Sequence, residues 1–154
     1  MNPLARANTA AFVIPSALMA GALGSQHIGG LYPCEMCYWQ RGPHEAAIAL
    51  AILAFFVRGR ARVWLIALAA VAVLVSGAIG LFHAGVEYGW WPGVTACAAG
   101  ATGSGDTLAE IMRTPLVSCD KPQWTLAGIS LAGFNALFST LGGLTILTLL
   151  RSRR

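Results

Sequence analysis

Two pairs of cysteines are the residues of this chain most able to do chemistry. Cys34 and Cys37 lie in the stretch LYPCEMCYWQR, and Arg41 follows the second of them by four positions. A pair at this spacing recurs in redox sites, because a thiolate there can be stabilised and the disulfide can be opened and closed again. Cys97 and Cys119 enclose a longer segment, and its closure would stabilise the fold by about 3 kcal/mol in the chain-entropy model. The first pair is typical of thiol exchange, whereas the second suits either exchange or a structural role.

The composition places these cysteines in a membrane protein. Of the 154 residues, 56% are hydrophobic and only 10% are charged, and the mean hydropathy is +0.66. A typical soluble domain has about 25% charged residues. A chain of this length suits a single domain.

Four stretches are apolar and long enough to cross a hydrocarbon core, which takes about 20 helical residues. They are residues 8–28, 39–57, 63–83 and 125–150. The first is too long for the apolar core of a typical signal peptide, so we expect it to be a span. The second must recruit residues from Trp39 onward, because its uninterrupted apolar part is short. The expected fold class is therefore an all-α membrane protein, a bundle of four transmembrane helices.

The distribution of charge predicts the orientation of this bundle. Seven arginines, with no acidic residue among them, flank one set of span ends, whereas three cations meet six acidic residues around the loops 29–38 and 84–124. Because arginine and lysine near spans stay on the cytoplasmic side, both termini are expected inside. All four cysteines are then outside, where disulfides persist. The formal net charge of +4 is interpreted as a topology signal and a contact for anionic membrane lipid, and no nucleic-acid-binding surface is expected.

The long outer loop is predicted to carry one short amphipathic helix. Thr107 and Glu110 form a capping box ahead of an apolar face, and Pro115 ends the segment. We expect this helix to lie on the membrane surface and to let the loop move.

Other roles for the cysteines fit less well. A zinc ribbon needs two close pairs, and the second pair is too widely spaced, so no metal is expected. Haem attachment needs a histidine where Tyr38 stands. Two inert disulfides in a membrane scaffold are the main alternative. We favour redox chemistry, because a cysteine pair at the start of a span lies within reach of a lipid-soluble electron acceptor, and the Arg41 guanidinium would stabilise a nearby thiolate.

Several stretches together resemble a known family. They are PCEMCYWQR, PHEAAIAL, GLFHAGVEYGWWPGVTAC and SCDKPQWTLAGISLAGFNALF, and they are similar to the bacterial disulfide bond formation protein B family, DsbB, in its short proteobacterial form. The resemblance covers nearly the whole chain. It implies a four-helix protein of the bacterial inner membrane that reoxidises a periplasmic thioredoxin-like dithiol oxidase of the DsbA type. The electrons would pass to a membrane quinone, either ubiquinone or menaquinone.

The resemblance also implies a role for each cysteine. Cys97 would form the mixed disulfide with the partner, and Cys119 would pair with Cys97 at rest and with Cys34 during transfer. Cys37 would face the quinone, and the charge of Arg41 would adjust the pKa of the Cys37 thiol.

Two further residues, and one further activity, are left open. His83 and Glu87 fall where the family places additional quinone-site residues, and the alternative is a polar cap at the end of the third helix. The alternative activity is that of a quinone reductase resembling the vitamin K epoxide reductase group. In that group the close cysteine pair usually lies on a later span, whereas here it opens the second.

Other polar, aromatic and small residues have structural interpretations. We expect His44 and Glu45 to form a hydrated start of the second span, and the alternative is an interfacial pair near a quinone head group. The tryptophans are predicted to form an aromatic belt, and the small residues to pack helices together. These residues are Trp39, Trp90, Trp91 and Trp124, and Gly77, Gly80, Gly128 and Gly133.

Overall fold

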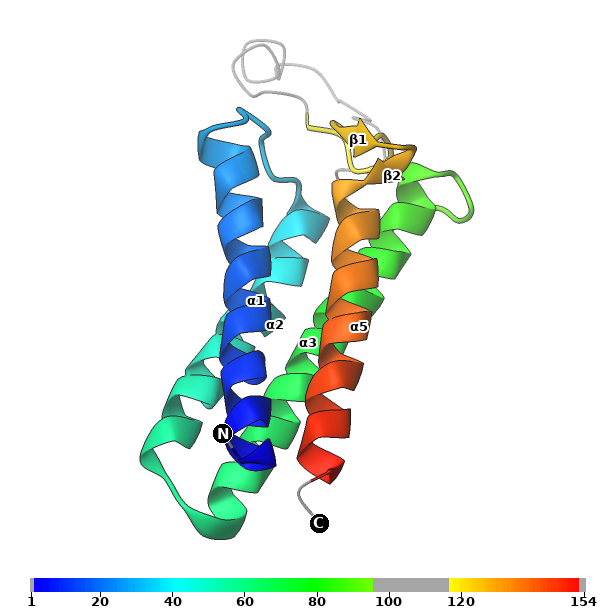
Figure 1. The fold of residues 1–154 in the computed structure, drawn as a ribbon. Helices are drawn as coiled ribbons and strands as arrows, with labels where there is room; N and C mark the ends of the chain where they lie inside the picture. Colours follow the sequence, from blue (N-terminus) through cyan, green and yellow to red (C-terminus); the bar gives the residue numbers. More distant parts are fainter. Residues whose placement is uncertain (1, 96–116, 153–154) are drawn as a thin grey trace.

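The computed structural model describes residues 2–95 and 117–152. This part of the chain forms helices α1 (Pro3–His27), α2 (Glu35–Phe56), α3 (Gly59–Glu87) and α5 (Leu131–Arg151), together with a short hairpin of β1 (Thr125–Leu126) and β2 (Ile129–Ser130). The helices run up and down beside one another, with both termini at one end and the hairpin and the start of α2 at the other (Figure 1). Cys97 and the predicted surface helix lie outside the described residues.

Three of the described helices are long and apolar enough to cross a membrane. They are α1, α3 and α5, with mean hydropathies of 1.4, 2.6 and 1.5. Helix α2 does not meet the same test, since polar side chains from Gln40 to Glu45 lower its mean hydropathy. Its second half still exposes large apolar side chains such as Ile52, Phe55 and Phe56, as expected of a surface that meets lipid. The predicted helical architecture is confirmed, and a fourth crossing by α2 stays a prediction.

The first turn of α2 starts earlier than the predicted span. Cys34 caps the helix, because its sulfur accepts a hydrogen bond from the backbone N–H of Cys37 at 3.3 Å. The close cysteine pair therefore lies at the start of this helix, although the predicted span begins only at Trp39. A rigid first turn fixes the separation of the two sulfurs.

The start of the fourth predicted span also differs from the structure. Residues 125–130 form the β1–β2 hairpin, whose turn residues Ala127 and Gly128 both have positive φ, 51° and 79°. Helix α5 begins only after Ser130, whose hydroxyl accepts from the N–H of Gly133. Gly128 was predicted to pack helices together, and this was wrong: it is a turn residue with open space around it.

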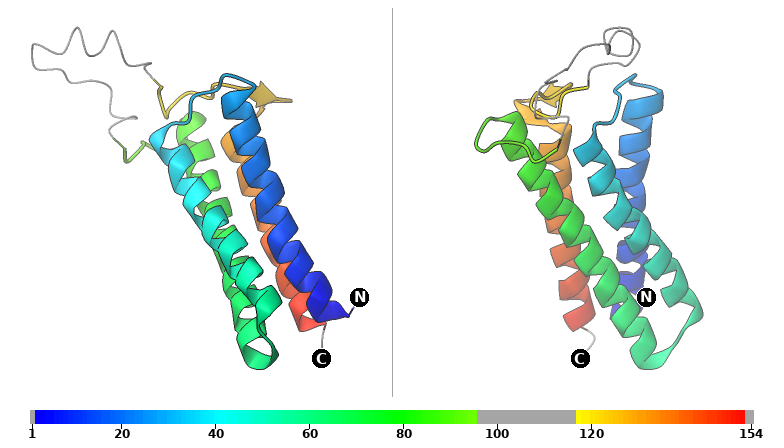
Figure 2. Two further views of the ribbon diagram at one scale, coloured as in Figure 1. Left: turned by 90° about the vertical axis from the view of Figure 1, so that its left-hand side faces the viewer. Right: turned by 180° about the vertical axis from the view of Figure 1, so that it is seen from behind.

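The bundle is held by small residues where the helices cross. Helix α3 packs against α2 and α5, and α1 packs against α2 and α5, so that α1 lies beside α5 and α2 beside α3 (Figure 2). A Cβ added at Gly80 would lie 3.0 Å from the backbone of α5 and 3.0 Å from Nδ2 of Asn135, and one added at Gly77 would lie 3.0 Å from Oγ1 of Thr140. The packing role of these two glycines is confirmed.

Candidate functional site

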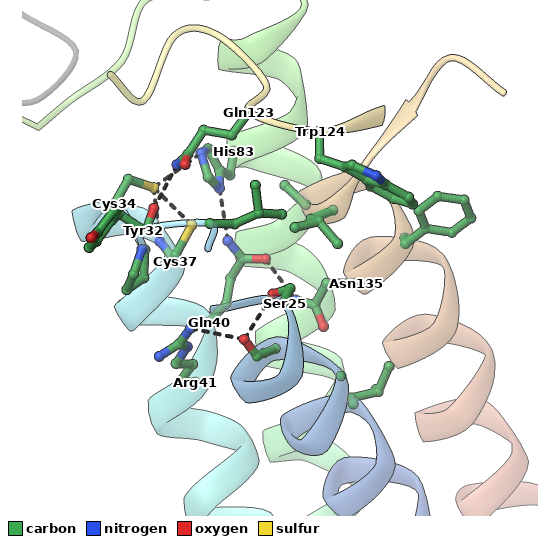
Figure 3. Close-up of a pocket in the computed structure, with 18 of the residues that line it drawn as sticks. Ser25, Tyr32, Cys34, Cys37, Gln40, Arg41, His83, Gln123, Trp124 and Asn135 are labelled. Atoms are coloured by element: carbon green, nitrogen blue, oxygen red, sulfur yellow. Dashed lines mark hydrogen bonds between the residues drawn. The ribbon is translucent and has the colours of Figure 1, made fainter. Parts of the chain in front are cut away.

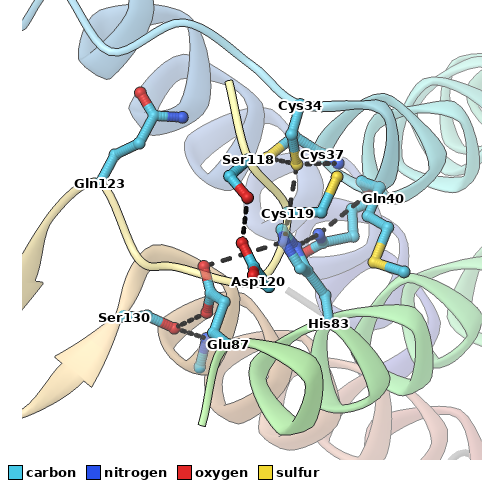
Figure 4. A network of polar contacts seen from close by, with 12 residues as sticks. Cys34, Cys37, Gln40, His83, Glu87, Ser118, Cys119, Asp120, Gln123 and Ser130 are labelled. Carbon is cyan, nitrogen blue, oxygen red and sulfur yellow. Dashed lines mark hydrogen bonds and ion pairs between the residues drawn. The ribbon is translucent and has the colours of Figure 1, made fainter. Parts of the chain in front are cut away.

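Cys34 and Cys37 bring their sulfur atoms together at the start of α2. The two Sγ atoms are 2.9 Å apart, and both residues are free thiols (Figure 4). Cys34 is buried and Cys37 is half-buried. The hydrogen bond with Cys37 and then burial raise the pKa of the Cys34 thiol. In the reduced pair Cys34 therefore keeps its proton and donates it toward the sulfur of Cys37.

Cys119 reaches this pair from the segment that precedes the hairpin. Its side chain is fully buried and packs in one apolar cluster with Cys34, Met36 and Val86. The hydroxyl of Thr95 donates a hydrogen bond to its sulfur at 3.6 Å. The structure thus places one member of the distant pair against the close pair, as thiol exchange between them requires.

His83 approaches the sulfurs from the last turns of α3. Its Nε2 atom lies 3.5 Å from Sγ of Cys34 and 3.8 Å from Oε1 of Glu87, and the side chain is buried (Figure 4). Glu87 in turn accepts a hydrogen bond from the hydroxyl of Ser130, which ties the end of α3 to the start of α5. Both residues line the cavity described below.

A buried polar network continues from His83 into the middle of the bundle. Gln40 Nε2 is 2.9 Å from Nδ1 of His83, and Asn135 Nδ2 is 2.8 Å from Oε1 of Gln40. Asn135 Oδ1 is 3.0 Å from Nε2 of His44, and Ser76 Oγ is 2.9 Å from the same nitrogen. The prediction of a hydrated helix start was wrong for His44, which is only 4% exposed.

Sequence reasoning missed Gln40, Ser76 and Asn135. A signal was present, because each is a polar residue inside or beside an apolar stretch, where polar groups are costly unless they are paired. The hydrogen bonds between these residues join α2, α3 and α5, so no single stretch of the sequence indicates them.

A cavity of about 270 Å³ opens beside the sulfurs and is bounded by all four described helices (Figure 3). Its walls include Leu18, Leu31 and Trp124, while Cys37 and Arg41 lie on its polar side. A quinone head group is a flat ring with two carbonyl acceptors, so apolar walls with a few donors suit it. The residues present therefore fit a quinone, and Arg41 and His83 are among the polar residues that line the cavity.

Arg41 lies at the cavity, but its hydrogen bonds lead away from the cysteines. Its Nη1 donates to Oε1 of Gln26 at 2.7 Å and its Nη2 to the carbonyl of Ala22 at 3.4 Å, both on α1. The guanidinium carbon also lies 5.3 Å from the ring centre of Tyr38. Arg41 therefore acts on Cys37 through its charge and not through a hydrogen bond of the structure.

The predicted site residues form one cluster where they are described. Cys34, Cys37, Cys119, His83 and Glu87 meet at the end of the bundle opposite the two termini (Figure 1), with Arg41 beside them. Two sulfurs and Nε2 of His83 also lie within 4.8 Å of one another. That spacing alone would suit a metal ion.

Comparisons with known proteins agree with the resemblance of the motifs. The family model described as "Disulfide bond formation protein DsbB" matches residues 5–149. A disulfide bond formation protein B of Verminephrobacter eiseniae is 32% identical over 142 residues, which cover 87% of this chain and 78% of the relative. One from a Polaromonas species is 31% identical over 149 residues, covering 90% and 87% of the two chains. No solved structure gives a significant match.

Proposed function

The chain belongs to the disulfide bond formation protein B family, and from that membership we propose that it is a quinone-dependent thiol oxidase. It takes electrons from a reduced thioredoxin-like dithiol oxidase of the DsbA type. It delivers them to a quinone in the bacterial inner membrane. The coarser assignment, a membrane protein of disulfide bond formation, follows from the family itself.

One observation carries the proposal. The close cysteine pair packs against the buried Cys119 of the distant pair, and both of its cysteines also line an apolar cavity. A protein substrate in water and a ring dissolved in lipid need two different entrances. Sulfurs that connect the two entrances are suited to pass electrons between them.

The sulfur chemistry is a series of thiol exchanges. A thiolate of the partner attacks Cys97 in the Cys97–Cys119 disulfide, and Cys119 leaves as a thiolate. Cys119 then attacks Cys34 in the Cys34–Cys37 disulfide, and Cys37 leaves as the thiolate that faces the cavity. The partner's second thiol then attacks the partner sulfur of the mixed disulfide, and Cys97 leaves as a thiolate. Cys97 attacks Cys119 in the Cys119–Cys34 disulfide, which restores the Cys97–Cys119 bond and releases Cys34, so that Cys34 and Cys37 form the dithiol. A bound quinone supplies the acceptor for the two electrons and two protons that the dithiol gives up.

The remaining residues hold this pathway in place. Arg41 places a fixed positive charge beside Cys37 and offers a donor to a quinone carbonyl. His83 and Glu87 line the same cavity, where they orient the ring. For the cysteines to face the periplasm, all four described helices must cross the membrane, with both termini in the cytoplasm. Helix α2 then keeps its polar first turns at the outer interface.

An anaerobic assay tests the proposal. The purified protein, with its disulfides intact, is mixed with a reduced thioredoxin-like oxidase and a water-soluble short-chain quinone. We expect one quinone to be reduced for each partner dithiol oxidised. A quinone that stays oxidised while the partner keeps both thiols would remove the proposal. A matched reaction with Cys97→Ser must be inactive, which shows that the partner uses the distant pair.

A further inference from the structure

A series of hydrogen bonds runs from the centre of the bundle to the sulfur of Cys37. It passes from His44 through Asn135, Gln40, His83 and Cys34, with successive atoms 3.0, 2.8, 2.9, 3.5 and 2.9 Å apart. All of these residues except Cys37 and Asn135 are buried, and those two are half-buried. Two backbone carbonyls fix the donor and the acceptor in the bonds from His44 to Cys34. In the last bond the raised pKa of the Cys34 thiol leaves the proton on Cys34.

The two amides can point only one way. Gln40 Nε2 donates to the carbonyl of Met36 at 3.1 Å, and Asn135 Nδ2 donates to the carbonyl of Ser76 at 3.2 Å. A carbonyl only accepts, so each amide nitrogen is assigned and each amide oxygen is placed opposite. Asn135 therefore donates to Oε1 of Gln40. Gln40 in turn donates to His83.

The amides then fix both histidines. Nδ1 of His83 must accept from Gln40, so a neutral ring carries its hydrogen on Nε2. That atom faces the sulfur of Cys34 and the carboxylate of Glu87, and the backbone of Cys119 also accepts a hydrogen bond from the ring. His44 has its hydrogen on Nε2 as well, since Oδ1 of Asn135 can only accept. The hydroxyl hydrogen of Ser76 is already given to the carbonyl of Gln40.

We propose that these bonds form a one-directional donor chain, from His44 to Cys37, that stabilises negative charge on the Cys37 sulfur. Gln40 and Asn135 are its positioning residues: they act through His83, whose Nε2–H supports Cys34 while Cys34 donates to Cys37. Hydrogen bonds aligned in one direction polarise one another and become stronger donors at the end of the chain. The use of this thiolate as an electron donor rests on the proposed function, but the chain itself does not.

Other groups near Cys37 do not supply the same support. The charges that act on it are those of Glu87 and Arg41, which have opposite signs. The hydrogen bonds of Arg41 go to α1.

The state of His83 can be observed without quinone or partner. In reduced protein that lacks the distant pair through Cys97→Ser and Cys119→Ser, a long-range proton–nitrogen correlation spectrum reports which ring nitrogen is protonated. We expect hydrogen on Nε2 and none on Nδ1 at neutral pH. Hydrogen on Nδ1 of the neutral ring would overturn the proposal. This spectrum requires no substitution in the donor chain itself, so a variant that fails to fold at one of those positions cannot obscure the result.

Two matched variants test the effect on the thiolate. In the same background, thiolate absorbance against pH gives the thiolate fraction of the close pair. Gln40→Met keeps the side-chain length but cannot donate, and we expect the thiolate fraction near neutral pH to fall about fivefold. Asn8→Leu removes a buried amide of α1 that lies outside the cavity lining and has no hydrogen-bond partner among the described residues, and should leave the fraction unchanged. If the thiolate fraction is unchanged in Gln40→Met, or falls equally in both variants, the proposed donor chain is wrong, whether or not quinone reduction is intact.

Discussion

Nε2 of His83 lies 3.5 Å from Sγ of Cys34, although 49 positions separate the two residues along the chain. The contact joins the last turns of α3 to the start of α2, and α3 also packs closely against α5 at Gly77 and Gly80. It joins the redox pair to a polar network that no single stretch of sequence contains. The chemistry of the sulfurs is therefore coupled to the packing of the helices.

The two sulfurs of the close pair should differ in reactivity. The pKa of the Cys34 thiol is raised, so at neutral pH it stays protonated and is the weaker nucleophile. In reduced protein with Cys97→Ser and Cys119→Ser, iodoacetamide should label Cys37 at least about tenfold faster than Cys34, as expected for a difference of one pKa unit or more. Peptide mass spectrometry measures both rates. Equal labelling would contradict the assignment of the proton.

Cys119 should form a disulfide with Cys34 once their usual partners are removed. The two sulfurs share one buried cluster, so a variant with Cys37→Ser and Cys97→Ser should close this bond under mild oxidation. The matched variant with Cys34→Ser and Cys97→Ser leaves Cys37 as the only choice for Cys119 and should close more slowly. Non-reducing peptide maps compare them, and faster closure to Cys37 would be evidence against the exchange order.

Gly80→Ala should destabilise the bundle and disturb the site together. The added Cβ would meet Nδ2 of Asn135 and the backbone of α5 at 3.0 Å, and overpacking of this kind costs about 1–3 kcal/mol. Gly24→Ala is the control, because nothing lies within 4 Å of a Cβ there. Unfolding in detergent titrations gives both free energies. If the two variants were equally stable, the close approach of α3 and α5 would be wrong.

Asn8→Leu should make the protein more stable. Asn8 is fully buried in α1, and neither its side-chain nitrogen nor its oxygen has a hydrogen-bond partner in the part of the chain that the structure describes. An unpaired buried amide costs about 1–3 kcal/mol, which leucine of similar size recovers. Asn135→Leu makes the same change where the amide is fully paired, and should lower stability. The same unfolding titrations compare the two, and a loss of stability in Asn8→Leu would show that its amide is satisfied.

Much of the architecture could be predicted from local sequence. Apolar length indicates helices, and the spacing of Cys34 and Cys37 predicts that their sulfurs meet, because both depend on residues close together in the chain. The family resemblance, now confirmed, added Cys119, His83 and Glu87 to the same site. The proximity of Cys119 to Cys34 is a contact between distant segments, and the order of the spans alone left the cysteine connectivity open.

What the sequence did not reveal depends on contacts between helices. His44 looked like a polar residue at a span end, yet it is buried because Ser76 of α3 and Asn135 of α5 provide partners for its ring. Gly128 looked like the packing glycines of α3, yet the hairpin needs its positive φ. In both cases the residue type was read correctly as polar or small, and its surroundings came from segments far away in the chain.

The central claim is that electrons leave through Cys37, and one measurement tests it directly. Reduced partner, soluble quinone and the Cys37→Ser variant are mixed without oxygen, and quinone absorbance is followed while trapped disulfides are mapped. The account predicts that quinone reduction stops while a mixed disulfide between the partner and Cys97 still forms. Quinone reduction at the rate of the unmodified protein would contradict it.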